Sequence, residues 1–249
     1  MIVLGIDIGG SGIKGAPVDT AAGLLTAKRI RLPTPPPARP ADVAEVVKKI
    51  VDGFNWKGPV GFTMPGRVKH GVMHTAANID NGWVGADAQQ IFVQATGCPV
   101  MVLNDADAAG VAEMAFGAGR ASQGVVLMLT FGTGIGSGLF CNGILVPNTE
   151  LGHLRLHGDK AEAYAAASAK KRDNLTWRDW AGRVQEYLDH VEFLFAPDLI
   201  ILGGGVSRPK KVKKYLHLLK TTARMVPAQL ENEAGIIGAA YAARSLQAA

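Results

Sequence analysis

The segment Gly5–Asp19, GIDIGGSGIKGAPVD, decides the fold. The apolar run that opens the chain is interrupted at Asp7, turns through glycines 9, 10 and 12, and resumes as a second extended run. This pattern predicts a β-hairpin with a carboxylate at its mouth and Lys14 close behind. Because glycine lets backbone N–H groups converge in conformations that other residues avoid, such turns attract anions. The start of the chain therefore predicts a phosphate-binding turn.

The same pattern returns about half a chain later. Val125–Phe140, VVLMLTFGTGIGSGLF, again joins a strand, a glycine turn and a return strand. Aligning the two turns places the residues 7–10 on the residues 130–133. Repetition at this spacing predicts an internal duplication and two related lobes.

Strands alternate with helices along the chain, which predicts an α/β fold with a mixed central sheet in each lobe. We expect a small N-terminal lobe over residues 1–105 and a large C-terminal lobe over residues 106–234. The final helix, residues 235–249, is rich in small residues and is expected to pack back on the first lobe. The active site would lie in the cleft between the lobes.

The composition excludes several classes of protein. No stretch approaches the ~18 uninterrupted apolar residues of a membrane span, and the start does not have the layout of a signal peptide. Cys98 and Cys141 are too few and too far apart for a disulfide framework or a tetrahedral zinc site. We therefore expect a cytoplasmic protein without a membrane partner. The net charge of +5 permits an anionic partner but does not identify one.

A third strand, Leu199–Gly205 (LIILGGG), also ends in a glycine turn. Three such turns around a cleft predict a site for a phosphate chain, with Lys14 as a cationic ligand and Asp7 beside a Mg²⁺ ion. Neither a Walker motif nor the full dinucleotide fingerprint is present. The predicted phosphate-binding residues are Asp7, Gly9, Gly10, Ser11, Gly12, Lys14, Thr130, Gly132, Thr133, Gly134, Gly204 and Gly205.

Asp105 is the candidate for a catalytic base. It ends the predicted strand Pro99–Asp105 and starts a helix, whose N–H groups keep a carboxylate ionised. Phosphoryl transfer needs alignment, charge neutralisation and a base for the attacking hydroxyl. The alternative is that Asp105 only caps the helix, which is the commoner use of such an aspartate.

Side chains of the kind that bind sugar hydroxyls accompany this aspartate. Carboxylates and amides accept and donate hydrogen bonds in pairs, as a polyhydroxylated substrate requires. In the motif ELGH, Glu150 and His153 are three residues apart, so on a turn they point the same way. Glu162 also suits the ordinary chemistry of a helix N-terminus. The candidate sugar ligands are Asn78, Asn104, Glu150, His153 and Glu162.

Six motifs resemble, in order, those of the ROK family of bacterial sugar kinases, which belongs to the actin-like ATPase and sugar kinase superfamily. They are DIGGSGIKG, MPG, LNDADAAGVAE, TFGTGIGSG, ELGH and LIILGGGVS, and together they span nearly the whole chain. The resemblance implies two duplicated actin-like (ribonuclease H-like) lobes, a homodimer, and phosphorylation of the 6-hydroxyl of a hexose. By matching position it makes Asp105 the general base, and it assigns sugar binding to Gly66, Asn78, Asn104, Asp105, Glu150, His153 and Glu162.

Two departures from the family pattern narrow the expected donor. Many ROK members carry a cysteine-rich zinc motif after Glu-x-Gly-His, whereas no cysteine follows His153, so we expect no structural zinc. ATP-using relatives commonly read D-I-G-G-T-K, whereas Ser11 and Gly12 occupy the last two places here. Both departures resemble the polyphosphate glucokinase branch, which transfers the terminal phosphoryl group of inorganic polyphosphate to glucose.

The segment Leu175–Val184, LTWRDWAGRV, also resembles that branch. Trp177 and Trp180 lie three residues apart on one face of a predicted helix, Thr176–Phe195. The alternative for the two indoles themselves is that they simply pack in the core of the lobe.

Basic residues cluster after the third glycine turn, within a stretch from Leu199 to Leu230 that holds no Asp or Glu. We expect a helix after Pro209 whose lysines face outward and bind a long polyanion; the alternative is a solvated basic face. The candidate polyphosphate track consists of Lys170, Lys171, Arg172, Arg208, Lys210, Lys211, Lys213 and Lys214.

Three other functions remain open. An ATP-dependent ROK glucokinase or hexokinase is the main alternative, and use of both donors overlaps the two. The family also includes repressors with a DNA-binding domain ahead of the kinase-like part; because the first motif begins at Ile2, we expect no nucleic-acid partner. An actin-like filament protein would have no use for the sugar-binding candidates. The expected partners are glucose with polyphosphate, ATP or both.

Overall fold

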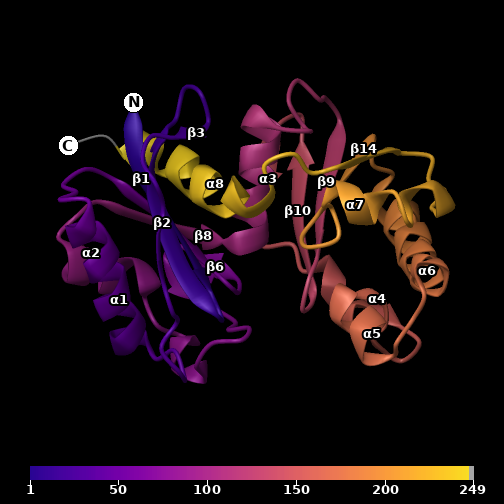
Figure 1. Cartoon of the computed structure of the whole chain (residues 1–249), viewed down its shortest axis with the longest axis horizontal. Coiled ribbons are helices and arrows are strands. Elements are labelled where there is room, and N and C mark those ends of the chain that lie inside the picture. The colour runs from indigo at the N-terminus through magenta and orange to yellow at the C-terminus, as the bar shows by residue number, and fades with distance from the viewer. Residues whose placement is uncertain (247–249) are drawn as a thin grey trace. The chain divides into compact units, whose positions relative to one another are not determined.

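The computed structural model describes residues 1–246, which form two compact units. The first unit comprises Met1–Ala112 and the chain from Asn232 onward, and the second comprises Glu113–Glu231. Each unit contains one large sheet with parallel and antiparallel strand pairs, together with helices (Figure 1). The α/β class with mixed central sheets is therefore confirmed.

The sheet of the first unit has the strand order β3-β2-β1-β5-β8, and β4 also pairs with β2. Strand β1 is antiparallel to β2 and parallel to β5, which is parallel to β8. The elements of this unit are β1 (Ile2–Gly9), β2 (Gly12–Asp19), β3 (Leu24–Leu25), β4 (Ile30–Leu32), α1 (Pro40–Gly53), β5 (Val60–Met64), β6 (Val68–Lys69), β7 (Val72–Met73), α2 (Ala88–Thr96), β8 (Val100–Asn104), the start of α3 (Asp105–Phe116) and α8 (Ala234–Ala243).

Opposite faces of this sheet are covered by different helices. Alternate residues of a strand point to one face, so Leu4, Ile6 and Ile8 of β1 share a buried core with residues of α1 and α2. Helix α8 packs on the other face, where a Cβ at Gly5 would collide with its backbone at Ile236. The small residues of α8 allow this close approach to the sheet. It brings α8 within contact distance of the row of β1 side chains that includes Asp7.

The sheet of the second unit has the strand order β11-β10-β9-β14-β15. Helix α6 packs on it through Trp180, Val184 and Tyr187, whose spacing of three and four residues places them on one helix face. None of the helices within residues 1–246 has both the length and the apolar character needed to cross a membrane. The elements are β9 (Val125–Phe131), β10 (Ile135–Cys141), β11 (Ile144–Val146), β12 (Arg155–Leu156), β13 (Asp159–Lys160), α4 (Ala161–Ala165), α5 (Ala167–Arg172), α6 (Trp177–Phe195), β14 (Leu199–Gly203), α7 (Pro209–Val212) and β15 (Arg224–Pro227).

The two sheets repeat one another strand by strand. Strands β9 and β10 form an antiparallel hairpin, as β1 and β2 do, and β14 pairs parallel to β9 as β5 pairs parallel to β1. The parallel pair β14–β15 then corresponds to β5–β8, and the short antiparallel edge strand β11 to β3. The duplication predicted from the two glycine turns is thus confirmed in the topology.

Several helices are shorter than the sequence indicates. Residues 161–172 do not form one continuous helix, because the extended backbone of Ala166 separates α4 from α5. The basic helix predicted after Pro209 ends at Val212, because four lysines within five residues repel one another at helical spacing. At the C-terminal end, α8 finishes at Ala243, and a 3-10 turn follows over Arg244–Leu246. Residues 247–249 of the predicted last helix lie outside the described residues.

Candidate active site

The first glycine turn is a tight hairpin between β1 and β2. Gly9 and Gly12 are register partners, with Gly10 and Ser11 between them at the tip. A Cβ at Gly10 would lie 2.9 Å from the carbonyl oxygen of Asn78, so the segment that carries this sugar-binding candidate rests on the hairpin tip. The structure therefore brings a predicted sugar ligand next to the predicted phosphate turn.

Four polar side chains form a row across the sheet beside this hairpin. Thr63, Asp7, Lys14 and Arg31 are successive register partners on β5, β1, β2 and β4. The Lys14 Nζ lies 3.0 Å from Asp7 Oδ2, and the Thr63 hydroxyl donates to Asp7 Oδ1 at 2.7 Å. The carboxylate of Asp7 is thus oriented by an ion pair on one side and a hydroxyl on the other.

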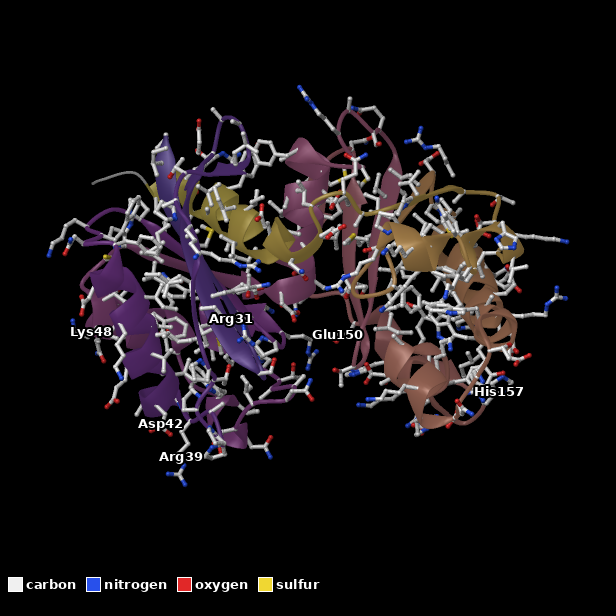
Figure 2. All side chains as sticks on the ribbon, in the orientation of Figure 1. Arg31, Arg39, Asp42, Lys48, Glu150 and His157 are labelled. Atoms are coloured by element: carbon white, nitrogen blue, oxygen red, sulfur yellow. The ribbon has the colours of Figure 1, made fainter. Side chains whose placement is uncertain are left out.

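Arg31 is a candidate that the sequence reasoning missed. It lies exposed on β4, labelled in Figure 2, directly across from Lys14, and like charges facing each other between strands are destabilising. Its guanidinium lies over Gly12 and makes one long hydrogen bond of 3.5 Å to the Ser11 carbonyl. No carboxylate forms an ion pair with it within residues 1–246. The sequence signal was the basic run KRIR over residues 28–31.

Magnesium is the cofactor that a phosphate site of this kind implies, and Asp7 fits it. Mg²⁺ is usually held by one or two carboxylates and completes its shell with water and substrate phosphates. The part of the chain that the structure describes gathers no group of three acidic, histidine or cysteine side chains. Asp7 would supply the single carboxylate at the hairpin mouth, and water and the phosphates of the donor would supply the remaining ligands of the ion.

Asn104 and Asp105 stand at the junction of β8 and α3. The Asn104 Oδ1 accepts hydrogen bonds from the N–H groups of Ala106 and Asp107 at 2.8 and 3.0 Å. Its Nδ2 donates to the carbonyl of Gly66 at 3.0 Å, which ties the MPG turn to the helix start. Asp105 itself is exposed, and its carboxylate accepts from the N–H of Ala106 at 2.8 Å. Asn104 therefore provides the cap that spans the first turn.

The second glycine turn joins β9 to β10 and is braced by helix α5. The N–H of Gly132 donates to the Gly134 carbonyl at 2.9 Å, which closes the turn. Ser168 donates from its N–H to the Gly132 carbonyl at 3.0 Å and from its hydroxyl to the Thr133 carbonyl at 2.5 Å. At Gly132 a Cβ would meet no atom within 4 Å, so the backbone here is open to a ligand.

The third glycine turn lies against the second within the same unit. Gly204 has a φ of +80°, and a Cβ there would be 2.5 Å from the Phe131 carbonyl oxygen. Thr130 is the register partner of Gly203 across β9 and β14. The Lys211 Nζ donates to the Gly205 carbonyl at 2.9 Å, which ties α7 to this turn. Two of the three predicted phosphate turns are therefore neighbours.

Two sugar-binding candidates of the second unit, His153 and Glu162, meet beside Gly134. The Glu162 Oε1 lies 3.2 Å from His153 Nε2, and its Oε2 accepts from the N–H of Ile135 at 3.2 Å. A Cβ at Gly134 would collide with the Glu162 carboxylate. A carboxylate and an imidazole are thus placed immediately beside the second phosphate turn.

Strand β10 positions the ELGH motif. The Ser137 hydroxyl accepts from the N–H of Leu151 at 2.9 Å, and a Cβ at Gly152 would collide with the Ile135 carbonyl. A 3-10 turn covers Leu151–His153, so Glu150 stands directly before this turn and His153 is its last residue. Only glycine permits this close approach, which accounts for its place in the motif.

Trp180 lies in the core of the second unit and the partly buried Trp177 packs against it, as the alternative of core packing predicts. Trp180 is fully buried, and its ring centroid lies 4.9 Å from that of Tyr215. Trp177 stacks on Tyr215 with 5.6 Å between centroids and an interplanar angle of 14°. Neither indole is presented as a flat binding surface.

Some cations of the candidate polyphosphate track contact other groups of the protein, and most of the track is exposed to solvent. Lys170 lies over the Trp177 ring at 4.7 Å and donates to the Leu175 carbonyl, and Arg172 pairs with Asp173. Lys211 is half-buried, with the backbone contact described above. The exposed members are Lys171, Arg172, Arg208, Lys210, Lys213 and Lys214.

Comparison with known proteins identifies relatives along the whole chain. The model of the ROK family matches residues 3–167. The polyphosphate glucokinase of Mycobacterium tuberculosis is 51% identical over 239 residues, 96% of this chain and 89% of the relative. The crystal structure of the inorganic polyphosphate/ATP-glucomannokinase from Arthrobacter sp. strain KM superposes with a TM-score of 0.92 and 48% identity, over 99% of both chains.

A more distant solved structure has the same fold. The ROK family glucokinase of Streptomyces griseus, in complex with glucose and AMPPNP, matches with a TM-score of 0.83 and 26% identity. The match covers 98% of this chain and 100% of that one. With a family model that covers well over half of its length, this chain belongs to the ROK family.

Proposed function

We propose that this chain is a polyphosphate-dependent glucokinase, which forms glucose 6-phosphate from glucose and the terminal phosphoryl group of inorganic polyphosphate. The observation that carries the proposal is 51% identity to a polyphosphate glucokinase across 96% of the chain. The geometry supports it, because the exposed carboxylate of Asp105 follows β8, and each unit carries a glycine turn of the kind that binds anions.

Asp105 acts as the general base in this proposal. Its carboxylate accepts the proton of the glucose 6-hydroxyl while that oxygen attacks the terminal phosphorus of the donor. The bond from this phosphorus to its bridging oxygen breaks, and the shortened polyphosphate leaves with the bond's electron pair. Because Asn104 caps α3, Asp105 is not required for that structural task.

Substrate orientation is assigned to the remaining sugar candidates. His153 and Glu162 bind sugar hydroxyls from beside the second glycine turn, and Glu150 adds an acceptor. Asn78, beside the first turn, and Gly66, held by Asn104, are the sugar-binding candidates that belong to the first unit.

The phosphates of the donor are assigned to the glycine turns and their cations. Backbone N–H groups of the turns, with the Thr130 and Thr133 hydroxyls, donate to phosphate oxygens. Lys14 and Arg31 neutralise charge beside the first turn. Mg²⁺, held by Asp7, supplies further charge neutralisation when bound, and chelation by EDTA is expected to abolish activity until Mg²⁺ is restored.

ATP is proposed as a second donor. The Arthrobacter relative is named for both polyphosphate and ATP, and the Streptomyces griseus relative was solved with an ATP analogue. The exposed cations from Arg208 to Lys214 follow the third glycine turn and would serve only the longer donor. We also propose a homodimer, from the family resemblance, and a cytoplasmic location, which the two free cysteines support.

The direct test is phosphorus NMR of glucose mixed with polyphosphate, Mg²⁺ and the purified protein. We expect a phosphomonoester signal of glucose 6-phosphate to grow as the terminal groups of the chains turn over, and the Asp105→Asn variant to produce almost none. Release of inorganic phosphate without a sugar ester would refute the proposed activity.

A further inference from the structure

Helix α4, which carries the sugar-binding candidate Glu162, is too short to be stable without contacts from the rest of the fold. It has five residues, Ala161–Ala165, and isolated helices of this length are unstable in water. The last four carbonyls of a helix also have no partner within it. The position of Glu162 must therefore be fixed by contacts from outside α4.

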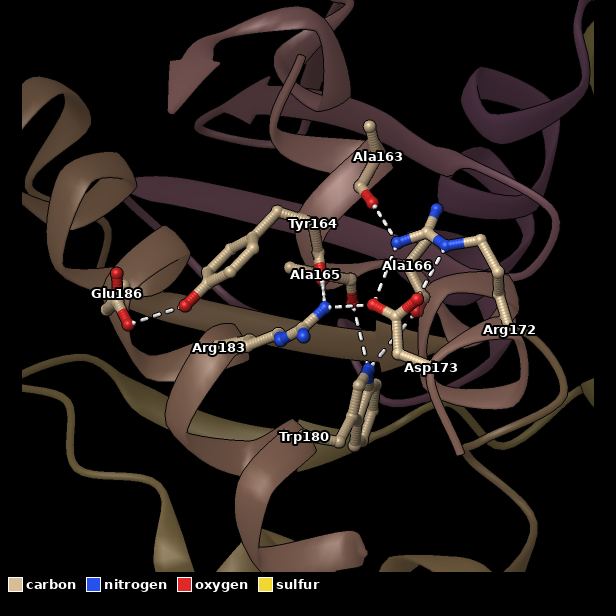
Figure 3. Close-up of polar contacts among 9 residues, drawn as sticks. All are labelled: Ala163, Tyr164, Ala165, Ala166, Arg172, Asp173, Trp180, Arg183 and Glu186. Atoms are coloured by element: carbon tan, nitrogen blue, oxygen red, sulfur yellow. Dashed lines mark hydrogen bonds and ion pairs between the residues drawn. The ribbon is translucent and has the colours of Figure 1, made fainter. Parts of the chain in front are cut away.

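Side chains from α5 and α6 bind the end carbonyls of α4 one after another (Figure 3). Arg172 donates to the Ala163 carbonyl at 3.0 Å, and Arg183 donates to the Tyr164 carbonyl at 3.2 Å. The indole N–H of Trp180 lies 2.9 Å from the Ala165 carbonyl and 3.2 Å from that of Ala166.

Asp173 joins the two arginines. Its carboxylate lies 2.7 Å from Arg172 Nε and 2.6 Å from Arg183 Nη1. The two guanidinium groups, Arg172 first, lower the pKa of Asp173 well below its usual range, so the network is ionised in any neutral assay. Arg183 also lies over the Tyr164 ring, 4.6 Å from its centroid.

Glu162 connects these contacts of α4 with the candidate sugar site. Glu162 is in the first turn of α4, and its carboxylate touches His153 and the N–H of Ile135 at the edge of the second glycine turn. Helix α6, from which Arg183 extends, has 19 residues and is packed in the core. A shift of α4 relative to α6 would therefore move the Glu162 carboxylate.

We propose that Arg183 and Asp173 are positioning residues for the glucose site, which hold α4 so that Glu162 meets the sugar. This inference rests on the proposed function, because it takes Glu162 as a sugar ligand. It assigns a role to three charged residues that neither the phosphate site nor the proposed chemistry uses. Arg172, placed in the polyphosphate track from the sequence, is assigned to this network instead.

The test compares steady-state kinetics of Arg183→Met, Glu162→Gln and the double variant. We expect Arg183→Met to raise the KM for glucose roughly 10-fold and to leave the KM for polyphosphate within about 2-fold, because misplacement affects only the sugar. Arg178→Met is the matched control, an exposed arginine on the same helix, and should leave both constants unchanged.

The double variant distinguishes positioning from simple destabilisation. If Arg183 acts through Glu162, adding Arg183→Met to Glu162→Gln should raise the KM for glucose by less than about 2-fold more. Full multiplication of the two single effects, or an unchanged KM in Arg183→Met, would overturn the positioning role while leaving the proposed sugar site intact. An unchanged KM in Glu162→Gln would instead refute the sugar site, and this inference with it.

Milder variants cover the case in which Arg183→Met does not fold. Asp173→Asn keeps the size of the side chain but removes the charge that joins the arginines, and should raise the KM for glucose by a smaller factor. Arg183→Lys keeps the cation and should recover part of the affinity. Wild-type glucose kinetics in Asp173→Asn together with Arg183→Lys would also contradict the proposal.

Discussion

Asn104, rather than Asp105, caps the first turn of helix α3, with its carboxamide oxygen accepting from the N–H groups two and three residues ahead. From the sequence, Asp105 is a candidate both for capping α3 and for acting as the general base. The structure assigns the cap to Asn104. A neutral amide holds the helix and the Gly66 turn, and the adjacent carboxylate is exposed at the helix start. The exposed carboxylate of Asp105 is the group that we propose as the general base.

Substitutions at these two positions should therefore have opposite signatures. Asp105→Asn should lower kcat by ~10²–10⁴-fold, with a much smaller effect on glucose binding and on unfolding in urea. Asn104→Ala should instead cost roughly 1–3 kcal/mol of stability, because it removes a cap and a buried hydrogen bond. A large loss of stability in Asp105→Asn would favour the capping role considered for this residue.

Arg31 faces Lys14 across β2 and β4 without a carboxylate partner in residues 1–246, an arrangement that an anionic ligand would stabilise. Arg31→Gln is expected to raise the KM for polyphosphate about 10-fold and to leave glucose binding unchanged, because a charge-assisted contact to phosphate is lost. Lys28→Gln, at an exposed lysine that precedes β4, is the control. An unchanged donor KM in Arg31→Gln would remove Arg31 from the phosphate site.

Gly132 and Gly134 offer a matched pair within one turn. An added Cβ at Gly132 meets nothing within 4 Å, whereas at Gly134 it would collide with the Glu162 carboxylate. Gly132→Ala should therefore keep wild-type stability and raise the KM for the phosphate donor, since the methyl group would stand where phosphate binds. Gly134→Ala should raise the KM for glucose as well. Wild-type donor kinetics in Gly132→Ala would show that the open side of this turn is not used.

Tyr187 carries a buried hydroxyl with no hydrogen-bond partner in the described chain, and burial first, then the nearby charge of Glu162, raises its pKa. Tyr187→Phe removes an unsatisfied polar group while it keeps the ring, so the variant should be roughly 1 kcal/mol more stable than the wild type. Urea unfolding measures this difference. A loss of stability would mean that the hydroxyl holds a buried water beneath Glu162.

The sequence predicted the duplicated sheets and the turns because both depend on local patterns: apolar runs that end in glycines. It could not predict how long the helices are. Alanine and lysine, which favour helix, predominate in the segment around Ala166, yet the side chains of Trp180 and Arg183 bind the carbonyls at which α4 ends. Such contacts join residues far apart in sequence.

The same limit explains what was missed at the site. Arg31 becomes a candidate only when the pairing of β4 with β2 sets it opposite Lys14, and register between strands is not visible in composition. The assignment of Lys170 and Arg172 to a polyanion track overlooked partners supplied by Trp177 and Asp173. Charge counts along a sequence cannot distinguish a cation held within the fold from one facing solvent.

The most direct test of the central claim is steady-state phosphorylation of glucose with long-chain polyphosphate and with Mg-ATP as separate donors, each at low and high salt. We predict activity with polyphosphate whose KM rises steeply with salt, since a chain bound by several cations releases counterions. Neutralising Lys210, Lys213 and Lys214 together should weaken that salt dependence and spare ATP. Activity with ATP alone, at any salt concentration, would contradict the account.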